Sequence, residues 1–163
     1  CGIAICRHSA AHRAAMSVQA SYLEQGTGAR DAMDWNPEFS RRARGVPVYA
    51  TLRSLGRDGV AAIVDRTTAL AQRFASALAA SGRAEIVNDV VANQVLVRWL
   101  AADGDTAHAA EAVMAGVRAE GIAFFSGTTY RGERLMRISV SDWATDEGDV
   151  DRVVEALLRH ASS

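Results

Sequence analysis

The chain contains no lysine, because all 18 of its Lys+Arg residues are arginine. It therefore offers no lysine amine that could form a Schiff base with a carbonyl compound. Only 2 cysteines are present, Cys1 and Cys6, and no disulfide framework accompanies them. We interpret them as small apolar residues rather than as a metal or disulfide pair, and the absence of a disulfide pattern favours the cytoplasm.

Excess charge and long apolar runs are also missing. The net charge of −1 gives no electrostatic reason to expect binding to nucleic acid or to an anionic membrane. No apolar run approaches the length of a membrane span, so we expect no membrane partner. With 49% hydrophobic and 23% charged residues, the 163-residue chain has a globular composition that suits one small domain with an attached arm.

From Val60 onward, hydrophobic periodicity predicts an α+β domain, 60–163. Short antiparallel strands with helices on one face fit the predicted order of helix, strand, strand, helix, strand, strand, helix. The predicted elements are a helix from Val60 that stops at Gly82, strands over 85–91 and 94–100, a helix capped by Thr106, strands over 122–126 and 135–141, and a last helix capped by Thr145.

Residues 1–59 have the pattern of an arm that cannot bury a core alone. The predicted elements are a short buried strand over 2–6, a short helix over 7–16, a long loop over 17–39 and a helix from Ser40. Pro47 either kinks this last helix or marks its true start. Gly56 and Gly59 then break the chain.

Several short motifs occur in order along nearly the whole chain. They are Cys1-Gly2-Ile3-Ala4, Ser21-Tyr22-Leu23, Asp34-Trp35-Asn36-Pro37-Glu38, Ser40-Arg41-Arg42-Ala43-Arg44, Leu52-Arg53-Ser54-Leu55-Gly56-Arg57-Asp58-Gly59, Asn93-Gln94-Val95-Leu96-Val97 and Met136-Arg137-Ile138-Ser139-Val140. In this set the chain resembles the group II amino-acid decarboxylases, which depend on pyridoxal 5'-phosphate and include the aromatic-amino-acid and glutamate decarboxylases.

The resemblance implies the small C-terminal domain of a fold-type I enzyme, preceded by an arm (1–59) from the large domain. It also implies a homodimer whose substrate is an amino acid and whose reaction is that of a carboxy-lyase. In the resembling enzymes the cofactor lysine sits shortly before the segment that matches Cys1 to Cys6. We therefore expect this chain to be a C-terminal fragment that is inactive without the lysine-bearing domain.

The resemblance also suggests site residues. Tyr22 matches a loop tyrosine that helps to protonate the substrate carbon after carbon dioxide leaves; the alternative is a surface or interface tyrosine. Arg137 matches an arginine that can engage a substrate carboxylate, for which a guanidinium fork is well shaped. The alternative is a strand arginine paired with Asp142 or Glu133.

Phe39 and Ser40 match a segment that reaches the cofactor phosphate of the neighbouring subunit. The alternative is that the arginines after them lie on a solvated or subunit-facing helix. His8 and His12 have the spacing of zinc ligands on a helix, but a third ligand is not evident, and Asp103 and Asp105 lack the later ligands of a calcium loop. We therefore predict no metal site.

Other functions stay open at this point. An aminotransferase or a carbon–carbon lyase of the same fold type would share this small domain, and a stand-alone, non-catalytic α+β module would explain the missing lysine. We favour an aromatic amino acid as the substrate, because no second substrate-binding basic cluster is evident.

Overall fold

The computed structural model describes residues 3–17, 30–38 and 42–161. The chain divides into two compact units, Cys1–Ser54 and Leu55–Ser163. The assignment of residues 1–59 to an arm of a larger domain stays a prediction.

The second unit contains a four-stranded antiparallel sheet. Its strands are β1 (Ala84–Ile86), β2 (Gln94–Trp99), β3 (Ser126–Tyr130) and β4 (Glu133–Ser139), in the order β1-β2-β4-β3. Arg131 and Gly132 join β3 to β4, and both have positive φ values, of 52° and 85°. Such backbone angles are typical of a tight hairpin turn whose twist matches that of the strands.

The predicted strand over 122–126 is wrong, because β3 spans Ser126–Tyr130 and residues 122–125 are not in a strand. The hydrophobic pattern does not mark β3 as a strand, because it contains few apolar side chains. It nevertheless pairs with β4, with Gly127, Thr128 and Thr129 opposite Met136, Leu135 and Arg134. Pairing with a neighbouring strand, rather than local hydrophobic pattern, determines this element.

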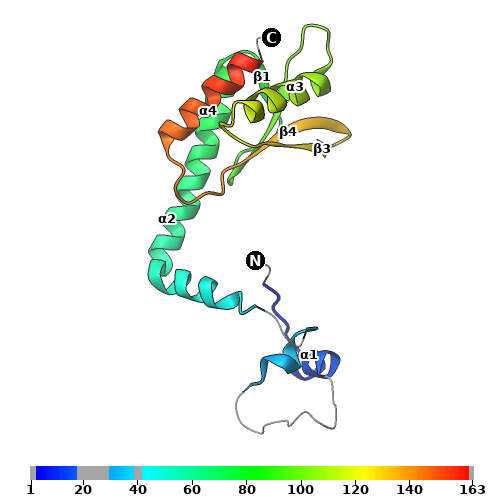
Figure 1. Cartoon of the computed structure of the whole chain (residues 1–163), viewed down its shortest axis with the longest axis vertical. Helices are drawn as coiled ribbons and strands as arrows, with labels where there is room; N and C mark the ends of the chain where they lie inside the picture. The colour runs from blue at the N-terminus through cyan, green and yellow to red at the C-terminus, as the bar shows by residue number, and fades with distance from the viewer. Residues whose placement is uncertain (1–2, 18–29, 39–41, 162–163) are drawn as a thin grey trace. The chain divides into compact units, whose positions relative to one another are not determined.

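Three helices complete this unit: the later part of α2 (Gly45–Ala80), α3 (Thr106–Ala119) and α4 (Glu147–His160). α3 and α4 lie side by side, and α3 covers β2 and β4 (Figure 1). Periodicity predicts an apolar stripe on α2 that consists of Val60, Ile63, Val64, Thr67, Leu70, Ala71, Phe74 and Leu78. From Thr67 onward this stripe is buried, whereas Val64 is 57% exposed. None of the helices in the described ranges has the length and hydropathy needed to cross a bilayer.

Both predicted helix caps are displaced by one residue. The side chain of Asp105, not of Thr106, accepts a hydrogen bond from the backbone N–H of His108 at the start of α3. Asp146, not Thr145, caps α4, where it forms a capping box with Asp149. In each case the aspartate stands at the position whose carboxylate can reach the exposed N–H groups of the first turn.

One face of the sheet is buried in the core, and the other, here called the open face, is partly exposed, although Leu135 on it is 0% exposed. Val95, Val97 and Trp99 of β2 and Met136 and Ile138 of β4 are at most 2% exposed and belong to the core. Leu96 and Arg98 of β2 and Arg137 of β4 alternate with them and point to the other face. The predicted α+β class, an antiparallel sheet with helices on one face, is confirmed.

The first unit contains α1 (Ser9–Met16), the short 3₁₀ helix η1 (Ala32–Trp35) and the start of α2. Helix α2 begins at Gly45 and is interrupted at Gly56, so Pro47 lies in its first turn, where proline is tolerated. The predicted buried strand over 2–6 is wrong for its described part. Residues 3–6 are not in a strand, and Ile3 and Ile5 are 77% and 94% exposed.

Candidate functional site

Arg137 lies in the middle of β4 on the open face of the sheet. It stands opposite Leu96 on one side and Ser126 on the other. Its Nη2 donates a hydrogen bond to the hydroxyl of Ser126 at 3.2 Å. Among the described residues it makes no salt bridge, so the predicted alternative pairing with Asp142 or Glu133 is not what the structure has. The guanidinium is exposed and available to an anion.

Two neighbouring arginines differ from Arg137 in this respect. Arg98, on the same face, bonds to Glu133 of β4 and Glu85 of β1. These hydrogen bonds, that of Glu133 first, raise the pKa of Arg98 above its ordinary value. Arg134, on the opposite face of β4, donates two hydrogen bonds to Glu111 of α3, at 3.0 and 2.8 Å. Each of these two charges is balanced within the unit.

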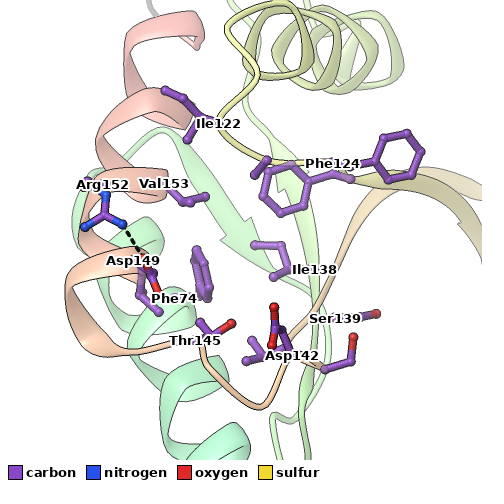
Figure 2. A pocket seen from close by; sticks show the side chains of 15 residues that line it. Phe74, Ile122, Phe124, Ile138, Ser139, Asp142, Thr145, Asp149, Arg152 and Val153 are labelled. Carbon is purple, nitrogen blue, oxygen red and sulfur yellow. Dashed lines mark hydrogen bonds and ion pairs between the residues drawn. The ribbon is translucent and has the colours of Figure 1, made fainter.

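A cavity of about 460 Å³ opens at the end of the sheet where β4 leads into α4. Phe74, Ile138 and Val153 contribute apolar walls, and Asp142 and Thr145 contribute polar groups (Figure 2). Phe124 lies at one side of the cavity and is 75% exposed. Arg137 is not part of its lining. The cavity can accept an apolar group, and two carboxylates, those of Asp142 and Asp149, belong to its lining together with Arg152.

The first unit contains a buried carboxylate that sequence reasoning missed. Asp34 in η1 is only 3% exposed, and its two oxygens accept hydrogen bonds from Arg13 and Ser17. Its sequence signal is weak, since Asp34 stands among turn-forming residues where a solvent-facing aspartate is common. Tyr22, Phe39 and Ser40 lie outside the described residues. His12, which the sequence offers as a zinc ligand, lies edge-on to Trp35 with ring centroids 5.4 Å apart.

Comparison with known proteins decides the family. The model of the pyridoxal-dependent decarboxylase conserved domain matches residues 1–100. The chain belongs to the pyridoxal-dependent decarboxylase family. Tyrosine decarboxylase 2 of Arabidopsis thaliana is 26% identical over 155 residues, which cover 91% of this chain and 28% of that protein. Tryptophan decarboxylase 2 of Oryza sativa subsp. japonica is 26% identical over 141 residues, covering 85% of this chain and 28% of the relative.

Solved structures share the fold. The crystal structure of Oryza sativa TDC with PLP and tryptamine superposes with a TM-score of 0.81 at 19% identity, covering 92% of this chain and 33% of that one. Mouse CSAD superposes with a TM-score of 0.79 at 14% identity, covering 92% of this chain and 34% of that one. The chain thus spans about a third of each of these structures and 28% of the two sequence relatives.

Pyridoxal phosphate is the cofactor of this family, and the residues of this chain do not suffice to hold it. The chain has no lysine for the cofactor aldehyde. On the open sheet face, the described residues include one arginine without a carboxylate partner, Arg137. Its guanidinium can bind an anionic group, but it cannot replace the lysine amine that forms an imine with the cofactor. This chain alone therefore does not fit the complete cofactor site.

Proposed function

We propose that this chain is the C-terminal part of a pyridoxal-phosphate-dependent L-amino-acid decarboxylase of fold type I, with an aromatic amino acid as substrate. The lysine-bearing part would lie outside the given sequence. The family match carries the proposal, and the names of the plant tyrosine and tryptophan decarboxylases support the aromatic substrate class. We further propose a homodimer, since the segment with Phe39 and Ser40 resembles one that reaches a neighbouring subunit's cofactor phosphate. We propose a cytoplasmic location because no disulfide framework accompanies the 2 cysteines.

In the proposed reaction, the bond between Cα and the carboxylate of the amino acid breaks, carbon dioxide leaves, and Cα takes up a proton to give the amine. When bound by the complete protein, the cofactor would supply the electron sink for this bond cleavage. The protein residues bind the substrate, exclude water and deliver the proton.

We assign Arg137 to substrate binding. The observation that supports this role is the contrast with Arg98 and Arg134, whose charges are balanced by glutamates, whereas Arg137 bonds only to the Ser126 hydroxyl among the described residues. A guanidinium that has no carboxylate partner in the protein can donate two parallel hydrogen bonds to a substrate carboxylate. We assign Tyr22 to proton delivery and Phe39 and Ser40 to the phosphate, on the resemblance alone.

The test uses the longest polypeptide whose reading frame contains this chain, purified with pyridoxal phosphate. L-tryptophan, L-tyrosine and L-glutamate are supplied, and carbon dioxide and the amine are measured. We expect the aromatic amines to form in amounts equal to the carbon dioxide. In a parallel assay that also supplies a 2-oxo acid as acceptor of the amino group, formation of the substrate's own 2-oxo acid without carbon dioxide would instead identify an aminotransferase.

A substitution at Arg137 tests its role. Arg137→Gln is expected to raise KM about tenfold or more, because a charge-assisted hydrogen bond to the substrate is lost. Arg137→Lys keeps the charge but not the fork and is expected to give an intermediate KM. The matched control is Arg134→Gln on the same strand, whose KM is expected to stay unchanged. Equal KM values for all variants would exclude Arg137 from substrate binding.

A further inference from the structure

A second cavity, of about 480 Å³, lies in the second unit where β2 ends. Trp99, the last residue of β2, and Leu100 contribute to its lining, together with Ala109 and Val113 of α3 and His160 of α4. Because β2 and β4 are antiparallel, this cavity and the cavity of Figure 2 lie at opposite ends of the sheet. A cavity of this size can hold a small organic molecule.

The buried part of the lining contains a hydrogen-bond donor that lacks an acceptor. Trp99 is 1% exposed, and within residues 3–17, 30–38 and 42–161 its indole Nε1 has no hydrogen-bond partner. Buried indole N–H groups in folded proteins usually find a partner, so an unpaired one in a cavity wall points to an acceptor supplied by a ligand. Val113 and Ala109 add apolar surface to the same lining. An aromatic ring that carries an oxygen acceptor matches both features.

The exposed part of the lining is acidic. Asp103 and Asp105 are exposed there, and among the described residues each accepts a backbone hydrogen bond of 2.9 Å and neither forms a salt bridge. The lining that the structure describes also includes His108 but no arginine. His160 contacts Glu120 at 2.7 Å, so a positive charge on its ring is balanced within the unit. Two carboxylates without a cationic partner favour an ammonium group over an anion.

We propose that this cavity is a binding site for an arylalkylamine that carries a phenol group. The aromatic ring contacts Val113, the phenol oxygen accepts a hydrogen bond from Nε1 of Trp99, and the ammonium group lies beside Asp103 and Asp105. Arg137 is not part of the lining, so the site is separate from the residue that we assign to substrate binding. The choice of an aromatic amine agrees with the product class of the proposed function, and only this relation to the reaction rests on that function.

The first experiment measures binding without any activity. The chain has 3 tryptophans, and the Trp99→Phe variant identifies the Trp99 indole signal in a nitrogen-15 NMR spectrum. Tyramine is expected to bind saturably and to shift this signal. Phenethylamine, which lacks the phenol oxygen, and 3-(4-hydroxyphenyl)propionate, which has a carboxylate instead of the ammonium group, are expected to bind at least about threefold more weakly. Absence of saturable tyramine binding, or equal affinity for the propionate, would overturn the proposal.

The second experiment separates the two ends of the ligand by calorimetry, with the chain as given and with the longest polypeptide that contains it. Trp99→Phe is expected to weaken tyramine binding about threefold to tenfold and to leave phenethylamine binding within about twofold. Because this change lies in the core, the exposed double variant Asp103→Asn with Asp105→Asn provides an independent test. It keeps a side chain that can cap α3 and is expected to weaken binding of both amines about threefold or more.

The matched control is Asp89→Asn, which removes an exposed carboxylate of the same unit outside the lining and is expected to leave tyramine binding unchanged. Undiminished tyramine binding in the double aspartate variant, or an equal loss for both amines in Trp99→Phe, would overturn the proposed site. Failure of the proposed function has a different signature, because the complete polypeptide would then release no carbon dioxide whether or not tyramine binds.

Discussion

The imidazole of His160 in α4 lies over Gly116 of α3, in the space that a Cβ at position 116 would occupy. Gly116→Ala is therefore expected to displace His160, break its 2.7 Å contact with Glu120 and destabilise the chain by about 1–3 kcal/mol. Chemical denaturation of the two proteins measures this difference.

Introducing Gly116→Ala into the His160→Ala variant tests whether the loss of stability comes from steric overlap between the new Cβ and the His160 imidazole. Without the imidazole, Gly116→Ala is expected to stabilise the chain by up to about 1 kcal/mol, because alanine favours a helix interior over glycine. Gly127→Ala is a second comparison: the nearest atoms to its Cβ would be those of the Arg134 guanidinium, on an exposed side chain that pairs with Glu111, and its cost is expected to stay near that of a surface salt bridge, about 1 kcal/mol. A similar loss from Gly116→Ala in both backgrounds would contradict the overlap.

The pH dependence of stability is expected to involve Glu120, the residue that follows α3. Hydrogen bonds from His160 and then from Arg159 lower its pKa below the ordinary value of 4.5. The unfolded chain therefore binds more protons on acidification, so the contribution of Glu120 is complete above pH 4.5 and is lost as the pH falls through the folded pKa.

Urea unfolding at a series of acidic pH values measures this effect. Glu120→Gln is expected to reduce the loss of stability below pH 4.5. Glu155→Gln serves as the matched control, because Glu155 lies 3.7 Å from the same Arg159 but is 75% exposed at its side chain. If the Glu120→Gln variant and the unmodified chain lost the same stability below pH 4.5, Glu120 would not contribute to the pH dependence.

The capping of α4 gives a third prediction. Asp146→Ala removes the carboxylate that accepts a hydrogen bond from the backbone N–H of Asp149. The substitution is expected to lower the free energy of unfolding by about 0.5–2 kcal/mol. Thr145→Ala, at the position that the sequence alone favours, is expected to cost less, because Thr145 is not the cap. Thermal unfolding of the two variants checks the order, and the reverse order would show that Thr145 is the true cap.

The missing lysine gives a fourth prediction. When the chain alone is mixed with pyridoxal phosphate and treated with borohydride, we expect no side chain to be labelled, because the only primary amine is the terminal α-amino group. Peptide mass spectrometry locates any label. A phosphopyridoxyl group on an internal residue would contradict this expectation.

Several features were determined by the sequence itself. The alternation of Val95, Val97 and Trp99 with Leu96 and Arg98 correctly predicts the two faces of β2, because side chains of any strand alternate. The apolar stripes of α2, α3 and α4 likewise follow from helical geometry. The ordered motifs indicated the family that the comparison shows.

Only the tertiary structure decided how the polar groups pair. Arg98 reaches Glu85 and Glu133, which lie 13 and 35 residues away, because strand order and register bring β1 and β4 beside β2. The same register leaves Arg137 beside Ser126. Likewise, Asp34 is buried because Arg13, 21 residues earlier, balances its charge. Local periodicity reports which side of an element faces the core, whereas an ion pair depends on which distant element comes to lie beside it.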